Sequence, residues 1–168
     1  MKKYLPFIFP AIAILIVIFL AVRWYNLNTD KKGQVNEFAQ GIEVEDIDLQ
    51  DIMAKNGAKD LEKVDLNDNE GKSLGSIRYQ IENQKVQLSV LASLPELTAG
   101  RYQVWFKQVD SDAVKKAFVL SEAKGGFLGS AAISADVLPF EVVVSKELVD
   151  DNTLEEIVLK GLMTGQGK

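Results

Sequence analysis

The sequence predicts a mainly β protein: an antiparallel Ig-like β-sandwich behind a single N-terminal transmembrane helix. Two observations support this prediction. The 18 residues of Leu5–Val22 include no charged or hydrogen-bonding side chain. From Leu61 onward, apolar and polar residues alternate in short runs that turn residues separate. Such alternation is typical of antiparallel strands with one buried and one solvated face.

The apolar stretch Leu5–Val22 has the length of a membrane span. As a helix it would be about 27 Å long, close to the roughly 30 Å hydrocarbon core of a bilayer. Trp24 and Tyr25 follow it, where aromatic side chains meet the lipid headgroups. We therefore expect a single-pass protein of the cell membrane, with a helix over 5–25, residues 1–4 in the cytoplasm and the body outside. A cleaved signal peptide is the alternative, although its apolar region is usually shorter.

The residue composition excludes several classes of chemistry. The chain has no cysteine and no histidine, so by itself it can form no disulfide, no zinc-thiolate site and no Ser-His-Asp triad. Beyond residue 25 it has 16 basic and 24 acidic residues, because three of its 19 basic residues come earlier. An acidic domain repels phosphate backbones, so we expect no nucleic-acid partner. We also expect no cofactor and no catalytic activity.

The segment between the apolar stretch and the strands is polar and variable in pattern. Residues 26–40 are predicted to be a stalk, and residues 41–168 the extracytoplasmic domain. Within that domain Asp48 could cap a short helix that ends near Lys55, before Asn56-Gly57. The alternation of apolar residues with acids around 47–49 would also suit an edge strand. We expect the short helix.

Eight strands are predicted in the body, at the near-regular spacing of a β-sandwich. Asn83-Gln84 joins the second and third as a hairpin, and the other connections contain glycine, proline, aspartate or asparagine. The predicted strands are Leu61–Leu66, Ile77–Glu82, Val86–Val90, Arg101–Gln108, Lys116–Ser121, Gly126–Ser134, Phe140–Ser145 and Glu156–Lys160.

The strand Arg101–Gln108 carries the most informative aromatic residues. Tyr102, Val104 and Phe106 share one face, which we expect to be core. Trp105 lies on the opposite face, where it is either covered by another element or exposed in a binding patch. We expect a covered Trp105, and we keep it as the candidate binding-surface residue.

Asp65, Asn67 and Asn69 place oxygen side chains at alternate positions, as the start of a calcium loop does. The glycine of such a loop would come one position earlier than Gly71, and its twelfth position is Ser76 rather than glutamate. Asp and Asn also satisfy turn backbone without a metal. We therefore expect a turn and keep the three residues as a weak calcium candidate.

The segment Gly71-Lys72-Ser73-Leu74-Gly75 matches the G-x-S-x-G pattern of hydrolases. That pattern requires a strand, a sharp turn and a helix, together with a histidine base. The surrounding residues predict strands, and histidine is absent. We expect a turn here. An envelope hydrolase that uses carboxylates or a Ser-Lys pair is one alternative function, and a structural envelope tether is another.

Three segments resemble the extracytoplasmic C-terminal domain of the anti-sigma-K factor family. They are Leu94–Trp105 (LPELTAGRYQVW), Ala117–Leu120 with the later Gly-Gly-Phe, and Val142–Glu147 with Ile157–Gly161. The resemblance implies a membrane-tethered β-sandwich that senses or binds an envelope protein or component. In that family a sigma-binding domain precedes the transmembrane helix, where this sequence has Met1–Tyr4. The resemblance therefore does not carry sigma-factor binding over to this chain.

Overall fold

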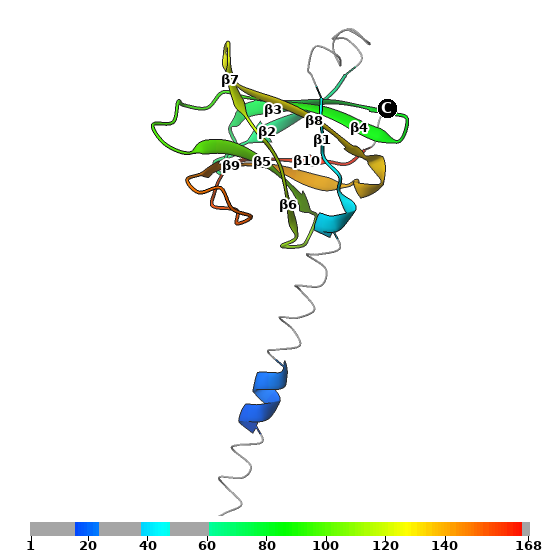
Figure 1. Cartoon of the computed structure of the whole chain (residues 1–168), viewed down its shortest axis with the longest axis vertical. Helices are drawn as coiled ribbons and strands as arrows, with labels where there is room; N and C mark the ends of the chain where they lie inside the picture. The colour runs from blue at the N-terminus through cyan, green and yellow to red at the C-terminus, as the bar shows by residue number, and fades with distance from the viewer. Residues whose placement is uncertain (1–15, 24–37, 48–60, 166–168) are drawn as a thin grey trace, which may run out of the picture.

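The computed structural model describes residues 16–23, 38–47 and 61–165, and over the last of these ranges the chain is mainly antiparallel β (Figure 1). The described residues form ten strands and one 3₁₀ turn, η1 (Ala135–Val137). The strands are β1 (Glu45–Asp46), β2 (Glu62–Asn67), β3 (Ser73–Glu82), β4 (Lys85–Ala92), β5 (Arg101–Gln108), β6 (Val114–Val119), β7 (Ser121–Ala123), β8 (Gly126–Ser134), β9 (Phe140–Glu147) and β10 (Glu156–Met163).

All ten described strands belong to one hydrogen-bonded sheet. Nine follow the order β1-β8-β4-β3-β2-β10-β9-β5-β6, and β7 pairs with β8 beside this path. Every pairing is antiparallel. Figure 1 shows β3, β4 and β8 above β5, β9 and β10, so the sheet curls over its own inner face. The two edge strands, β1 and β6, thereby come to the same side of the domain.

The consecutive strands β6 and β7 nearly close the sheet. β6 pairs with β5 at one end of the sheet order, whereas β7 pairs with β8 near the other. At Gly129 in β8 an added Cβ would lie 2.8 Å from a ring carbon of Phe118 in β6. The absence of a side chain there lets the two strands approach. Through β6 and β7 the chain therefore passes from one end of the sheet order to the other. Among the described strands, β6 and β1 do not pair with each other.

The hairpin β3–β4 shows why the alternating pattern predicts strands well. Its register pairs Glu82 with Lys85 across a two-residue turn, and Asn83 and Gln84 both have positive φ. That turn follows the right-handed twist of the strands. Tyr79 and Leu88, which face each other across the hairpin, are both buried.

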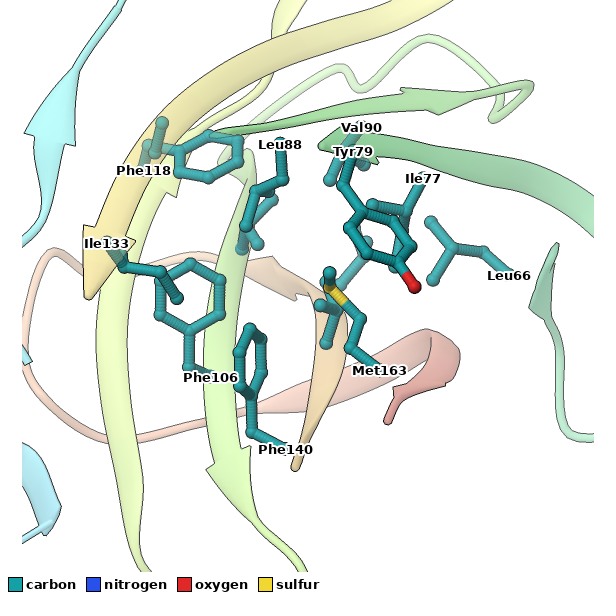
Figure 2. Close-up of a cluster of buried hydrophobic side chains, with 14 of the residues drawn as sticks. Leu66, Ile77, Tyr79, Leu88, Val90, Phe106, Phe118, Ile133, Phe140 and Met163 are labelled. Atoms are coloured by element: carbon teal, nitrogen blue, oxygen red, sulfur yellow. The ribbon is translucent and has the colours of Figure 1, made fainter. Parts of the chain in front are cut away.

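The core fills the space inside the curled sheet and is wholly apolar in its centre (Figure 2). Three phenylalanines meet there edge to face, with Phe106 5.0 Å from Phe140 and 6.5 Å from Phe118 between ring centroids. Tyr102 packs in the same way against Phe127, at 4.7 Å. The expectation that Tyr102, Val104 and Phe106 face the core is confirmed.

The prediction of a mainly antiparallel β body is confirmed, and strands β5 and β8 have the predicted bounds. The Ig-like division into two sheets is not confirmed, because one path of hydrogen bonds connects all the strands. The predicted strand Lys116–Ser121 is divided at Leu120, where the chain changes partners from β5 to β8. Alternation marks which residues face inward, but it carries no information about this change of partner.

Two predicted helices lie wholly or partly outside the described residues. Residues 16–23 are helical, and Val22 is exposed, whereas Leu5, Trp24 and Tyr25 fall outside. Within the described ranges, no helix combines the length and apolar character that a membrane crossing requires. The predicted helix after Asp48 also falls outside, although the preceding residues form the edge strand β1. Residues 38–41 are helical, and Phe38 packs against the core.

Candidate functional site

A groove of about 1000 Å³ opens along β6. Asp46, Ile47 and Ser130 line it from the β1–β8 side, where the Ser130 hydroxyl donates a hydrogen bond of 2.7 Å to the Ile47 carbonyl. The remaining lining residues come from helical residues 38–41, from β6, from the outer face of β5 and from the loop after β9. They are Ala39, Arg101, Gln103, Trp105, Val114, Lys115, Lys116, Ala117, Phe118, Val119, Asp150 and Asn152.

The groove lies between two strand edges. Among the described residues, β6 has a strand partner only in β5, and β1 only in β8. A strand edge with no neighbouring strand presents backbone N–H and C=O groups that can pair with another chain. An extended segment that lay along β6 in this groove would meet such unpaired backbone groups.

Trp105 lines the groove from the outer face of β5. It is 1 % exposed, as expected for a covered tryptophan. Its indole N–H donates to the Ser145 hydroxyl at 2.8 Å and to Oε1 of Glu147 at 3.2 Å. The Lys116 ammonium lies 5.9 Å from the centre of its ring, within the range of a cation–π contact. These contacts hold the ring in one orientation.

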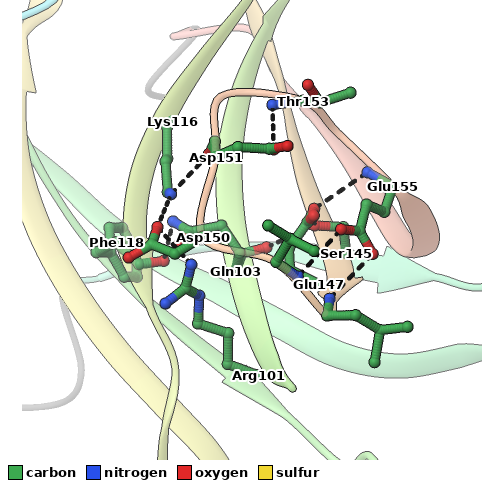
Figure 3. Close-up of polar contacts among 12 residues, drawn as sticks. Arg101, Gln103, Lys116, Phe118, Ser145, Glu147, Asp150, Asp151, Thr153 and Glu155 are labelled. Atoms are coloured by element: carbon green, nitrogen blue, oxygen red, sulfur yellow. Dashed lines mark hydrogen bonds and ion pairs between the residues drawn. The ribbon is translucent and has the colours of Figure 1, made fainter. Parts of the chain in front are cut away.

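The outer face of β5 and β9 is a buried polar cluster rather than a solvated surface (Figure 3). Gln103, Ser145 and Glu147 are each at most 2 % exposed. Oε1 of Glu147 accepts from the Ser145 hydroxyl and from the backbone N–H of Glu155 as well as from Trp105. The Gln103 side-chain amide donates to the carbonyls of Val104 and Phe118 at 3.0 and 2.8 Å.

The Gln103 bonds compensate for an irregularity in the pairing of β5 with β6. The register of the two strands shifts between Gln103 and Trp105. At the shift, the Gln103 side chain replaces a backbone donor for the Phe118 carbonyl. The same side chain thus ties β6 to β5 and lies at the groove.

Three charged side chains meet at the end of the groove (Figure 3). One oxygen of Asp150, Oδ1, pairs with both Arg101 and Lys116. The Lys116 ammonium also donates to the carbonyl of Asp151 at 2.8 Å. The hydrogen bonds from Lys116 and Arg101 lower the pKa of Asp150 below its ordinary value. Asp150 is nevertheless an exposed loop residue.

Among the described residues, three buried polar atoms that belong to groove residues have no hydrogen-bond partner. They are Oε1 of Gln103 and the Nε and Nη2 atoms of Arg101, although Nη2 forms the ion pair with Asp150. Buried polar groups are nearly always hydrogen-bonded in folded proteins, and an unpaired one costs about 1–3 kcal/mol. A donor and an acceptor at one groove, each lacking a partner, indicate a place for a ligand that supplies both.

The residues of the calcium candidate lie on β2 and in the turn that follows it. Asp65 pairs with Lys63 at 2.7 Å. In the turn, Oδ1 of Asp68 accepts the backbone N–H groups of Glu70 and Lys72, both at 2.9 Å. The turn backbone is satisfied by an aspartate side chain, as expected. In the described part of the chain no three Asp or Glu side chains converge in a metal-binding arrangement.

The G-x-S-x-G segment is the end of the same turn and the start of β3. Gly71 has φ +83, which the turn requires, and Ser73 is the exposed first residue of β3. The segment therefore joins two strands, as predicted, and has no helix after it.

Sequence reasoning identified Trp105 but missed the other groove residues. Gln103 alternates with apolar neighbours, as a solvated strand residue does, and Asp150 lies in a run of turn residues. Their importance depends on contacts with Phe118, Arg101 and Lys116, which are 15 to 49 positions away. The one available signal was that Gln103 shares a face of the predicted strand with Trp105, which was expected to be covered.

No protein-family model, no curated protein and no solved structure matches the chain.

Proposed function

We propose that this chain is a non-catalytic membrane-anchored module whose β domain lies outside the cytoplasm and binds an extended segment of a partner protein. The groove along β6 is the observation that carries the proposal. Adding a strand to a free edge is a common mode of peptide recognition, in which backbone hydrogen bonds give affinity and side-chain contacts give specificity. The covered Trp105 lies in the lining of this groove.

The partner segment is proposed to be acidic. Arg101, Lys115 and Lys116 line the groove, against two acidic residues, Asp46 and Asp150. Beyond residue 25, by contrast, the chain has 24 acidic and 16 basic residues. The groove is thus a basic site on an acidic domain, and electrostatic complementarity favours an acidic partner there.

The membrane anchor is proposed to be the apolar stretch Leu5–Val22, whose length and composition support it. The resemblance to the outer domain of anti-sigma-K factors suggests that the partner is an envelope protein in a signalling system. Sensing would then consist of the binding or release of that partner.

Hydrogen exchange of the full-length chain in lipid nanodiscs tests the binding function. The probe is a blocked seven-residue peptide of alternating valine and threonine with a central glutamate. We expect the amides of β6 and β1 to exchange more slowly when the peptide is added, whereas those of the β2–β3 hairpin serve as the internal control. Unchanged exchange in both edge strands would overturn the proposal. Self-association through these edges without added peptide would favour a structural tether instead.

Labelling of introduced cysteines tests the topology, because the natural chain has none. Lys124→Cys places a thiol at an exposed turn of the body, and Lys2→Cys places one before the apolar stretch. In intact cells a membrane-impermeant maleimide is expected to label the Lys124→Cys variant. The Lys2→Cys variant should react only after permeabilisation. The reverse pattern would contradict the proposed orientation.

A further inference from the structure

The contact of Asp150 with Arg101 and Lys116 uses only part of the hydrogen-bonding capacity of these two cations. This suggests that another carboxylate can take the place of Asp150. Asp150 is more than two-thirds exposed, whereas the side chains of Arg101 and Lys116 are 28 % and 25 % exposed. It reaches both cations through the single oxygen Oδ1. The more buried partners therefore receive only a monodentate contact, from the most accessible residue of the three.

Arginine binds a carboxylate best when Nε and one terminal nitrogen each donate to one of its two oxygens. The terminal nitrogen Nη2 of Arg101 forms an ion pair with Asp150, whereas the buried Nε has no hydrogen-bond partner among the described residues. One of the two donors is thus unused. A carboxylate that approached Arg101 from the groove could engage both.

Gln103 supplies a second and independent sign of a missing ligand. Gln103 lines the groove and is 1 % exposed, and its side-chain oxygen Oε1 has no hydrogen-bond partner in the described part of the chain. Its amide nitrogen already donates to two carbonyls, so the side chain cannot simply rotate to satisfy the oxygen. A backbone N–H of an extended peptide is a donor of the kind that this oxygen lacks.

We propose that Arg101 and Lys116 form the carboxylate subsite of the groove, and that Asp150 occupies it in the free protein until an acidic side chain of the partner displaces it. This inference rests on the proposed binding function and adds a specificity determinant to it. Asp150 acts as an internal competitor. Gln103 then accepts a hydrogen bond from the backbone of the same partner segment, and Trp105 lies beside it.

Displacement of Asp150 is favourable for a simple reason. Ion pairs of an exposed carboxylate contribute little to stability, because water and salt screen them and the loop loses freedom in forming them. A partner carboxylate that lies inside the groove would take over the ion pairs of Asp150 with Arg101 and Lys116, and it would replace the single-oxygen contact to Arg101 with a two-point contact. Removing Asp150 should therefore strengthen binding of an acidic segment.

The test compares two peptides on the full-length chain in lipid nanodiscs by calorimetric titration. The first is the valine-threonine heptapeptide with a central glutamate, and the second has glutamine in its place. We expect the glutamate peptide to bind about tenfold more tightly to the natural chain, as a charge-assisted contact implies. Asp150→Asn should tighten its binding further, and Arg101→Gln should remove the preference for glutamate.

Asp151→Asn is the matched control, because it changes the same charge in the same loop without touching the cations through its side chain. We expect it to leave the glutamate preference and the affinity nearly unchanged. Equal tightening by Asp150→Asn and Asp151→Asn would overturn displacement, since general charge would explain both. Equal binding of the two peptides to every variant would overturn the carboxylate subsite and leave the groove function standing. Binding of neither peptide to any variant would overturn both proposals.

Discussion

The two faces of strand β5 are both buried, but by different chemistry. Tyr102, Val104 and Phe106 point inward into an apolar core. Gln103 and Trp105 point outward, where they are 1 % exposed and lie among polar side chains. The inner face is stabilised by removal of apolar area from water and by close packing. The outer face depends instead on a buried hydrogen-bond network, in which each bond formed is favourable and each unpaired atom is a cost.

The comparison explains why the candidate site lies on the outer face. Every labelled side chain of the inner core in Figure 2 packs against other apolar groups. The outer face includes buried atoms without partners, among them Oε1 of Gln103 and Oε2 of Glu147. The side chains of a packed apolar core need no hydrogen-bond partner. The unpaired atoms of a polar network can still form a hydrogen bond with a ligand. Function is therefore expected where the outer network is incomplete.

The largest expected effect is on the inner face. Phe106→Ala should lower the free energy of unfolding by about 3–5 kcal/mol, because it removes a fully buried ring that packs against Phe118 and Phe140. Urea unfolding followed by circular dichroism measures it. Ile81→Ala, at a position 44 % exposed, is the control and should cost less than about 1 kcal/mol. Similar losses for the two variants would contradict the assignment of the core.

Glu147→Ala tests the outer network and should cost about 2–3 kcal/mol, because it leaves Trp105 and Ser145 with fewer partners in a buried place. Glu147→Gln keeps an oxygen at the same position and should cost clearly less. The same unfolding measurement compares the two variants. If the alanine variant proves as stable as the natural chain, the outer face depends on packing alone. That result would contradict the difference between an apolar inner face and a hydrogen-bonded outer face.

Tyr79 is an inner-face residue whose hydroxyl reaches the rim and donates to Glu62. Burial and the contact with Glu62 raise the pKa of Tyr79 to about 12. Because this folded-state pKa lies above the ordinary value of 10, its contribution to stability is complete below pH 10 and is lost as pH rises toward 12.

The alkaline absorbance titration of the natural chain minus that of Tyr79→Phe isolates this group. We expect a midpoint near 12, and a smaller loss of stability above pH 10 in the variant. A midpoint near 10 would mean that the Tyr79 hydroxyl is solvated, and it would contradict the assignment of Tyr79 to the inner face.

The smallest expected effect is that of Asp150→Asn on stability. Its pKa is lowered, so its contribution is present above the unfolded-state pKa and is lost as pH falls through the folded-state value. Because the residue is exposed, we expect no measurable change in the unfolding midpoint at pH 7. A large loss would show that Asp150 is structurally required and would contradict its role as a displaceable competitor.

The fold and the site were predictable to different degrees. The hairpin β3–β4 and the inward face of β5 follow from alternation, because a strand places successive side chains on opposite faces. The change of partner between β6 and β7 does not follow, because it depends on how far the sheet curls. The groove depends on that change, and its residues come from β1, β5, β6, β8 and the loop after β9.

The sequence by itself determined three properties of this protein. These are the apolar stretch at its start, the β character of its body, and the absence of any chemistry that requires histidine or cysteine. All three depend on residue type and local spacing. Only the tertiary structure decided that the outer face of β5 is buried and that Asp150 meets Arg101 and Lys116. The physical reason is that burial and charge pairing on this face are made by residues distant in sequence, and alternation within one strand fixes the direction of a side chain but not what covers it.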